Sequence, residues 1–443
     1  VPTCPEVVGK QALTSMPVIY QVFVNAPAGW RSHDIERQLF AARRLAFVEE
    51  KQLTNPDPLY YVVTLSNLTM VYKGLVQAEH LGDFYPDLRD ERMTSSVGIC
   101  HQRFSTNTLP RWNYAQPFRY LAHNGEINSV NANRDWANTR GGILHSPLLP
   151  RLEELSHLVN ESGSDSSSLD NLLEVFLAGG MDIFRAMRLM LPPAIRDDMD
   201  PDLKAFVEFN SMHQEPWDGP AGVVASNGRI ASCNMDRNGL RPARYSITHD
   251  GIFTVASETG VWDCPPERIK RRGRLGPGEM IAVDTQTGKF WKNNAIDDSL
   301  KANHAYREWM TENVIRVWNN DEQERKAANK FMRESADRLP TFQRLFGLGQ
   351  EEIDTIINPM AMEAQEPVGS MGDDTPVAVL STRNRSIYDY FRQSFAQVTN
   401  PPIDPLRESA VMSLETCIGR EHNVFHETAS HAYRVLLPWP VLN

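Results

Sequence analysis

Three short polar stretches in the middle of the chain carry side chains that could bind and activate an amino-acid substrate. Arg103 ends a β-prone run, and a guanidinium can hold a carboxylate through two parallel hydrogen bonds. Asn124 and Gly125 combine a side-chain amide with an unhindered backbone N–H, a pair that can stabilise a developing oxyanion. Asp165 follows Gly-Ser at a helix start and could accept hydrogen bonds from an ammonium group. Together these groups suit an α-amino acid that carries a reactive carbonyl.

Each of these residues also has a purely structural interpretation. Asn124-Gly125 is a common turn sequence, and Asp165 stands where a helix cap is expected. Taken singly, the structural interpretation is the commoner one. Only the combination of the three stretches favours a binding and catalytic role.

A nucleophile is not evident. Cys100 and His101 are adjacent, and neighbouring residues of a strand point to opposite faces, so these two cannot form a dyad with each other. Cys4 lies three residues from the start, between Thr and Pro. A hydrolase that uses Cys100 or Cys4 is a weaker alternative that the sequence leaves open.

The composition restricts the possible partners. The formal charge is -11, which argues against nucleic acid because binding phosphates requires a basic face. No apolar run is long enough for a transmembrane helix, so we expect no membrane association. The first residue is Val rather than Met, so we expect the chain to be processed or to be part of a longer protein.

Cysteine and histidine spacing argues against a metal centre. The five cysteines are scattered and form no CxxC pair, a pattern typical of reduced thiols in the cytoplasm. His426 and His431 are five residues apart, whereas a zincin helix needs its two histidines four apart. We therefore expect no metal and no cofactor in this segment.

The elements that must position the polar stretches follow from periodicity. Apolar residues at helical spacing predict helices over residues 33–50, 166–178, 182–191 and 201–210. Runs of β-branched and aromatic residues predict a hairpin over 59–65 and 68–74, a strand over 97–104, and hairpins over 221–226 with 229–233, 244–247 with 252–256, and 280–284 with 289–291. Residues 105–168 between them are interpreted as a functional loop system.

Strands, a helical layer and further strands predict an α+β domain whose sheets face helices. We expect this domain to cover residues 1–292. The charged, Asn-rich stretch 297–337 predicts a linker helix, within a helical linker that spans 293–345. A further unit is expected over 346–443, with helices at 350–358 and 386–395.

Long motifs resemble the class II glutamine amidotransferase domain of the glutamate synthase large subunit, and the similarity runs nearly from end to end. Further motifs near the C-terminus resemble the start of the central domain of that enzyme. The motifs are Val71–Gly74, Phe84–Leu88, Arg103–Thr108, Ala115–Asn128, Gly163–Ser166, Glu215–Pro220, Asp236–Tyr245, Glu366–Gly372 and Phe395–Pro405.

The resemblance implies an αββα sandwich of the N-terminal-nucleophile hydrolases, here incomplete at its N-terminus and followed by the helical linker and the start of an α/β central domain. It implies that Arg103 binds the glutamine carboxylate, with Thr106 in the same loop. Asn124 and Gly125 match the oxyanion hole, and Asp165 matches the acceptor of the substrate ammonium. The nucleophile of the family is an N-terminal cysteine, which we expect upstream of Val1, so this segment alone is expected to be inactive.

The resemblance also implies the chemistry of the parent enzyme. Glutamine is hydrolysed, and the ammonia is channelled to 2-oxoglutarate for reductive glutamate formation. FMN and an iron–sulfur cluster are expected in the parent, with electrons from an NADPH-linked or ferredoxin donor. We expect a cytoplasmic, oligomeric enzyme. The alternative is a non-catalytic scaffold that retains a glutamine-binding pocket.

Overall fold

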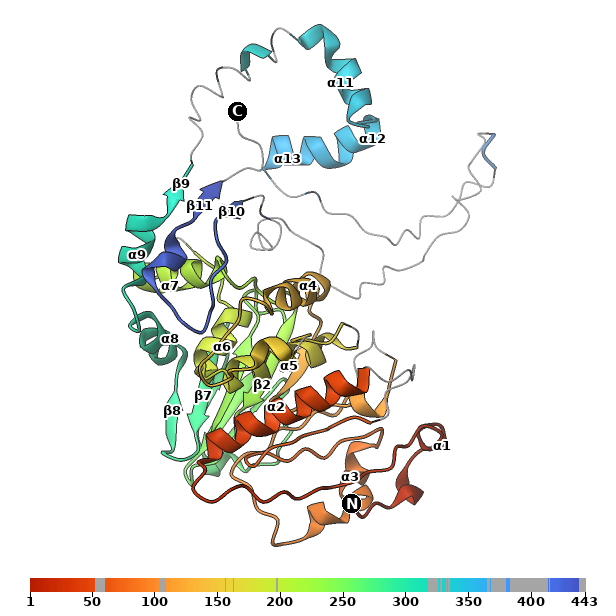
Figure 1. Ribbon diagram of the computed structural model, residues 1–443. Coiled ribbons are helices and arrows are strands. Elements are labelled where there is room, and N and C mark those ends of the chain that lie inside the picture. Colours follow the sequence, from red (N-terminus) through yellow and green to blue (C-terminus); the bar gives the residue numbers. More distant parts are fainter. Residues whose placement is uncertain are drawn as a thin grey trace. The chain divides into compact units, whose positions relative to one another are not determined.

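The computed structural model describes residues 1–51, 60–103, 109–155, 157–161, 163–196 and 198–317, together with 326, 329–331, 333, 335–364, 367, 380–382, 413 and 415–437. The chain divides into two units (Figure 1). The first contains residues 1–316 and 415–436, and the second contains 317–414 and 437–443. Each unit is described by itself.

A five-stranded antiparallel sheet forms the centre of the first unit. Its strands lie in the order β1-β2-β3-β7-β8, with neighbours close in sequence except between β1 and β2 and between β3 and β7. The register places Asn124 opposite Gly222 and Val223 opposite Asn234. The strands are β1 Leu121–Gly125, β2 Ala221–Ser226, β3 Ile230–Met235, β7 Met280–Asp284 and β8 Lys289–Trp291.

A second, three-stranded sheet covers one face of the first. It consists of β4 (Arg244–Thr248) between β5 (Phe253–Ala256) and β6 (Ile269–Arg274), all antiparallel. An apolar cluster joins side chains of both sheets, because alternate residues of a strand point to the same face. Its members are Cys233, Met235, Ala243, Leu275 and Ile281, with Tyr245, Phe253 and Phe290 packed against them.

Helices cover the opposite face of the five-stranded sheet. The alternate residues Ala221, Val223 and Ala225 of β2 belong to a large core that includes Leu169, Leu173 and Phe176 of α5 (Asp165–Ala178). This core draws on further helices, which are α2 Ser32–Lys51, α4 Val130–Arg140, α6 Ile183–Met190, α7 Pro201–Ser211, α8 Asn293–Lys301 and α9 Tyr306–Asn313. The architecture is thus α+β, as predicted.

Most predicted elements are confirmed. The predicted helices correspond to α2, α5, α6 and α7, and the three hairpins after residue 220 correspond to β2–β3, β4–β5 and β7–β8. All three hairpins have a glycine in the left-handed region at their turn: Gly228 (φ +87°), Gly251 (φ +86°) and Gly288 (φ +69°). The first two explain why Asn-Gly and Asp-Gly indicated hairpins.

The strands predicted before residue 105 are wrong for the described residues. Residues 60–74 and 97–103 have irregular backbone without a strand ladder. Side chains hold the first stretch instead: the Lys73 Nζ donates to the Asn113 carbonyl, and the Tyr85 hydroxyl donates to the Lys73 carbonyl. A β-prone run becomes a strand only when a neighbouring strand accepts its backbone hydrogen bonds, so composition alone could not decide.

The predicted linker helix over 297–337 is also wrong in its described part. The stretch contains the end of α8, then α9, then the short strand β9 (Ile315–Arg316). The break arises because Leu300 and Tyr306 are buried in the large core and hold the two short helices against α7. Residues 386–395 lie outside the described part of the chain.

The remaining elements are short. The second unit contains α11 (Leu339–Leu345), then α12 (Gln350–Glu352), a π-helical turn (Ile353–Ile357) and α13 (Asn358–Glu363), which confirms the helix predicted at 350–358. In the first unit, α1 is Lys10–Leu13 and α3 is Leu81–Phe84. The 3₁₀ turns are Pro5–Val7, Ala78–His80, Pro86–Arg89, Trp112–Tyr114, Leu152–Glu154, Pro266–Arg268, Ala336–Arg338 and Ala429–Ala432.

Within the described ranges, none of the helices has the length and apolar character that crossing a bilayer requires.

The chain returns to the first unit through residues 415–436, which we call the strap (blue in Figure 1). β11 (Val435–Leu437) lies between β10 (Thr416–Ile418) and β9, and it runs parallel to β9. The guanidinium of Arg185 on α6 donates to the Val424 carbonyl at 2.8 Å and pairs with Glu427 at 3.1 Å. Buried contacts of this kind attach the strap to the helical layer.

Arg188 on α6 provides a first prediction about the fold. Its buried guanidinium pairs with Asp297 on α8 and donates to the Gly278 carbonyl at 2.7 Å. Arg188→Ala should lower the free energy of unfolding by about 3–5 kcal/mol, because it leaves the buried Asp297 carboxylate without a counter-charge. Urea unfolding measures the loss. Arg196→Ala, whose side chain is exposed, is the control and should change the value by less than ~0.5 kcal/mol. Equal effects would contradict the role of the buried pair.

His431 in the strap predicts a pH dependence of stability. Its pKa is lowered to about 4, chiefly by burial and also by the neighbouring His213 and His422, while hydrogen bonds to Asn423 and Thr428 act in the opposite direction. The unfolded chain therefore binds a proton that the folded chain does not between pH 6.5 and about 4. Stability should fall on acidification through this window, with a slope that approaches about 1.4 kcal/mol per pH unit from this group.

Chemical unfolding at several pH values tests this slope. His431→Asn should reduce it, because the ionisable imidazole is gone. The exposed His426 on the same strap supplies the control variant His426→Asn, which should keep the wild-type slope. A His431→Asn profile as steep as that of the wild type would assign the pH dependence to other groups.

Candidate functional site

The loop that follows β1 is in direct backbone contact with residues 218–220. The Glu126 N–H donates to the Pro220 carbonyl at 2.9 Å, and the Asn128 N–H donates to the Asp218 carbonyl at 2.8 Å. Gly125 adopts φ +148°, and a Cβ on it would lie 1.8 Å from the Pro220 oxygen. Only glycine fits this position, so the Asn124-Gly125 pair is more than an ordinary turn.

Asn124, the residue before the end of β1, lies on the face of the five-stranded sheet that packs against the second sheet. It lies opposite Gly222, whose nearest side-chain neighbour is the Cβ of Arg241, at 3.7 Å from where a Cβ would stand. Within the described chain, no hydrogen bond is recorded for the Asn124 side-chain amide. The half-buried amide and the following backbone thus form a short polar edge at the end of the strand.

Asp165 links this edge to the start of α5. Its Oδ2 accepts from the Ile127 N–H at 2.7 Å, and its Oδ1 accepts from the Ser166 N–H at 2.6 Å and the Ser166 hydroxyl at 3.0 Å. The helix cap is Ser164, whose hydroxyl accepts from the Ser167 N–H at 3.1 Å. A carboxylate offers about four acceptor positions, so one acceptor position on Oδ2 remains for a ligand.

His123 is a site residue that the sequence analysis missed. It precedes Asn124 on β1, points to the helical face and is 2% exposed. Its Nδ1 lies 2.9 Å from the Ser166 hydroxyl and 3.7 Å from Asp165 Oδ2. Burial lowers the pKa of His123, so the imidazole is neutral at neutral pH. Its place one residue before Asn-Gly was the available signal, because alternation along a strand puts it on the face of α5.

Gln116 and Asp170 fix the position of β1. The Gln116 side chain accepts from the His123 N–H at 2.6 Å and donates to the His123 carbonyl at 3.0 Å, in the manner of a neighbouring strand. Asp170 on α5 accepts from the Tyr120 N–H at 2.8 Å, and burial raises its pKa to about 6. Sequence reasoning missed both, because their partners are backbone groups that no motif reveals.

Of the other two predicted site residues, only Arg103 lies in the described part of the chain, and no contact between its side chain and these groups is seen there. Arg103 is exposed, and its N–H donates to the Nδ1 of His101 at 3.3 Å. His101 itself lies near β1, since it contributes to the low pKa of His123. Thr106 lies outside the described residues. Arg103 is therefore near the strand, while the ligand-binding roles of Arg103, Thr106 and Asp165 stay predictions.

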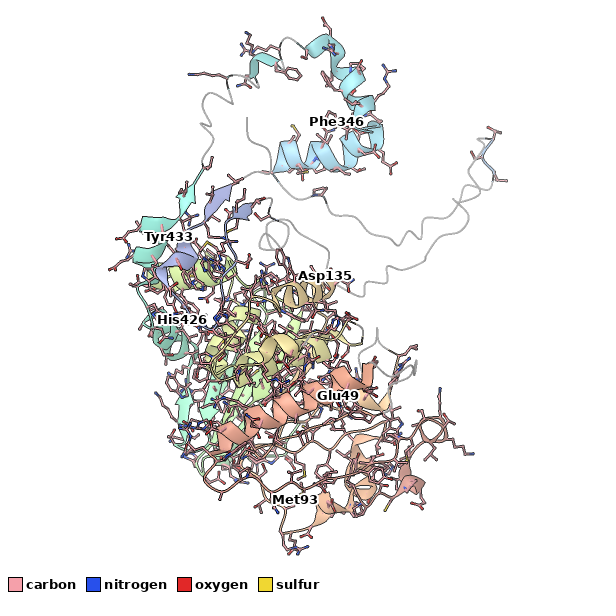
Figure 2. All side chains as sticks on the ribbon, in the orientation of Figure 1. Glu49, Met93, Asp135, Phe346, His426 and Tyr433 are labelled. Carbon is pink, nitrogen blue, oxygen red and sulfur yellow. The ribbon has the colours of Figure 1, made fainter. Side chains whose placement is uncertain are left out.

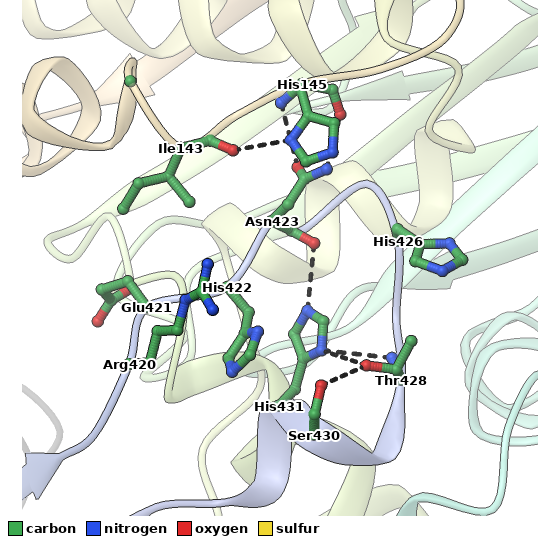
Figure 3. Close-up of a pocket in the computed structure, with 11 residues that line it drawn as sticks. Ile143, His145, Arg420, Glu421, His422, Asn423, His426, Thr428, Ser430 and His431 are labelled. Carbon is green, nitrogen blue, oxygen red and sulfur yellow. Dashed lines mark hydrogen bonds between the residues drawn. The ribbon is translucent and has the colours of Figure 1, made fainter.

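A separate cavity of about 660 Å³ opens between residues 142–145, after α4, and the strap (Figure 3). None of the predicted site residues lines it. In the close-up, Asn423 stands between its two histidine partners, with its carbonyl accepting from His431 Nε2 at 3.1 Å and its side chain donating to the His145 carbonyl. Although four histidines line the cavity, the described residues contain no group of three or more His, Cys, Asp or Glu arranged to hold a metal ion.

The contact at Gly125 yields a prediction. Gly125→Ala should displace the loop, because its Cβ would overlap the Pro220 carbonyl. We expect a loss of about 2 kcal/mol or more of stability, as for other substitutions at strained backbone positions. The control is Gly222→Ala on the facing strand, where the nearest atoms are 3.7 Å away. Thermal unfolding provides the measurement; equal losses of stability in the two variants would contradict the steric role of Gly125.

Comparison with known proteins identifies the family. The model of the class-II glutamine amidotransferases matches residues 1–309, and that of the glutamate synthase central domain matches residues 341–443. The whole chain is 40% identical over 451 residues to the chloroplastic ferredoxin-dependent glutamate synthase of Spinacia oleracea, and 41% identical to ferredoxin-dependent glutamate synthase 2 of Synechocystis. It is 39% identical over 449 residues to the large chain of the glutamate synthase [NADPH] of Azospirillum brasilense.

The chain spans 27–29% of the length of these three relatives. Its family match covers the β1 edge, α5 and both sheets, while the match to the central domain includes the strap. The chain therefore belongs to the class-II glutamine amidotransferase family, in the form that is joined to a glutamate synthase central domain.

Proposed function

We propose that this chain supplies the glutamine-hydrolysing part of a glutamate synthase. Glutamine is the substrate, and the ammonia released from its side-chain amide is passed on for reductive formation of glutamate from 2-oxoglutarate. The observation that carries the proposal is the end of β1, where Gly125 packs against the Pro220 carbonyl and the Ile127 N–H donates to an Asp165 carboxylate that retains one acceptor position. Asn124 lies next to Gly125, with its side chain on the face of β1 opposite to that of His123. The match to the amidotransferase family supports the same assignment.

Each residue then has a defined task. Asp165 accepts a hydrogen bond from the substrate ammonium, and Arg103 with Thr106 in its loop holds the α-carboxylate. The Asn124 side-chain amide and the Gly125 N–H donate to the carbonyl oxygen as it becomes negative. His123 is neutral and buried, so it adds no charge that would compete with the ammonium.

The reaction is a thioester route. A cysteine thiolate at the N-terminus of the mature enzyme attacks the side-chain carbonyl, and its free α-amine serves as base. Ammonia leaves as the tetrahedral intermediate collapses to the thioester. Water then hydrolyses the thioester, which releases glutamate and restores the thiol. This cysteine is expected upstream of Val1, so the segment supplies the binding groups and the oxyanion hole.

The fold supports this assignment as well. Helices, the five-stranded sheet and the three-stranded sheet follow one another in layers, which agrees with three of the four layers of an αββα N-terminal-nucleophile sandwich. The boundaries proposed at 292 and 345 stay predictions; the packing of α8 and α9 into the large core favours a first unit that extends to residue 316.

We assign FMN, the iron–sulfur cluster and the electron donor to the rest of the enzyme. The five cysteines are far apart in sequence, and the described residues hold no group of three or more His, Cys, Asp or Glu that could bind a metal. A cytoplasmic location and an oligomeric assembly also stay predictions.

Asn124→Ala in the complete gene product tests the function. The kcat of glutamine hydrolysis should fall by roughly 10²–10³, because one donor to the oxyanion is lost. Release of ammonia and glutamate is the measurement. The exposed Asn303 supplies a matched control, Asn303→Ala, which should keep the wild-type rate. If the wild type binds glutamine without turnover, the alternative of a non-catalytic glutamine-binding scaffold replaces this proposal.

A further inference from the structure

We propose that the strap positions the glutamine site by clamping the C-terminal ends of two helices: α5, which begins at Asp165, and α4, which begins five residues after Gly125. The inference rests on the proposed function and adds positioning residues to it. Phe425 acts on α5 and Glu421 acts on α4. The strap lies within the match to the glutamate synthase central domain, so a segment of that domain would set the geometry of the amidotransferase site.

The contact at α5 is a close apolar one. The ring of Phe425 meets the ring of Phe176 edge-on, with centroids 6.1 Å apart. It also fills the space beside Gly179, where an added Cβ would lie 2.2 Å from the Phe425 Cε1. Gly179 has ordinary helical backbone (φ -70°), so its missing side chain serves the close approach of the strap rather than a turn. The other end of this helix is Asp165.

The contact at α4 is a buried charge cluster. Arg140, the last residue of α4, donates to the Glu421 carboxylate at 3.2 Å and also pairs with Glu215. Arg434 of the strap contacts the same Glu421 at 3.2 Å. Burial raises the pKa of Glu421, but the His213 imidazole 3.9 Å away and the two guanidinium charges outweigh it and hold this pKa at about 2. Glu421 is thus ionised and tied to α4.

Both helices are rigid rods of about 16 and 21 Å that contact each other. α4 begins at Val130, five residues after Gly125, and α5 begins at Asp165. A displacement at the strap end is therefore carried to the site end. Shifts of about 1 Å in a catalytic group can reduce a rate by ~100-fold. A small displacement of α5 by the strap is therefore enough to change the kinetics at the site.

The test uses the complete gene product and Phe425→Ala. Because Asp165 binds the substrate ammonium, the KM for glutamine should rise about tenfold, with a smaller change in kcat. Glutamate formation from added ammonia and 2-oxoglutarate bypasses the glutamine site and should change less than about twofold. Phe425→Leu keeps most of the apolar contact and should restore the KM. The matched control is Tyr433→Ala, an exposed aromatic on the same strap (Figure 2), which should leave both activities unchanged.

A double-mutant cycle tests the contact from the other side. Gly179→Ala places a methyl group against Phe425 and should also raise the KM for glutamine. In the Phe425→Ala background the methyl group has room, so the same substitution should add almost nothing, and the two effects are non-additive. Additive effects would overturn the clamp, since they would mean that the two residues act independently.

The outcomes separate this inference from the function on which it rests. A wild-type enzyme without glutamine hydrolysis overturns the proposed function and the inference with it. A wild-type enzyme that hydrolyses glutamine, with Phe425→Ala and Gly179→Ala both within about twofold of its KM, overturns the clamp alone. Equal losses of glutamine-dependent and ammonia-dependent synthesis also overturn it, because they indicate general damage to the protein.

Discussion

The site depends on a backbone contact that leaves no space for side chains. Gly125 and Gly219 both adopt φ +148°, and a Cβ on Gly219 would lie 2.0 Å from the Glu126 carbonyl oxygen. The end of β1 and the start of β2 therefore pack backbone against backbone. This close approach lets the Ile127 N–H reach the Asp165 carboxylate at 2.7 Å. One steric constraint thus joins the central sheet to α5 at the point where the substrate is expected.

Burial then determines the charges around this contact. His123 and Asp170 lie in the same interior, and burial moves the pKa of each toward its neutral form, downward for the imidazole and upward to about 6 for the carboxyl. Asp165, at the start of α5, accepts hydrogen bonds from two backbone N–H groups and a hydroxyl. This well-anchored carboxylate is the one proposed to bind the substrate ammonium.

Local signals in the sequence predicted much of this architecture. Asn227-Gly228 and Asp250-Gly251 indicated hairpins because each turn needs a left-handed residue, and α5 followed from its apolar spacing and from the polar residues before it. Residue chemistry indicated Asn124, Gly125 and Asp165, and the resemblance to a known family favoured this interpretation over a purely structural one. Residues 60–74 and 97–103 were mispredicted because pairing, rather than composition, decides whether a run becomes a strand. His123 was missed because its partner Ser166 is distant in sequence, and Gln116 because its partners are backbone groups.

Contacts between residues that are distant in sequence also determine how the chain divides into units, so local sequence patterns did not predict this division. The strap lies about 100 residues beyond β9, and its match is to the central domain, yet it pairs with β9 and belongs to the first unit. Such contacts depend on the packing of residues that are far apart in sequence, such as the Phe425 ring in the space beside Gly179. No local sequence pattern indicates them. Domains defined by sequence families and units defined by packing therefore divide this chain differently. In the strap, a segment that matches the central domain is built into the packing of the unit that matches the amidotransferase family.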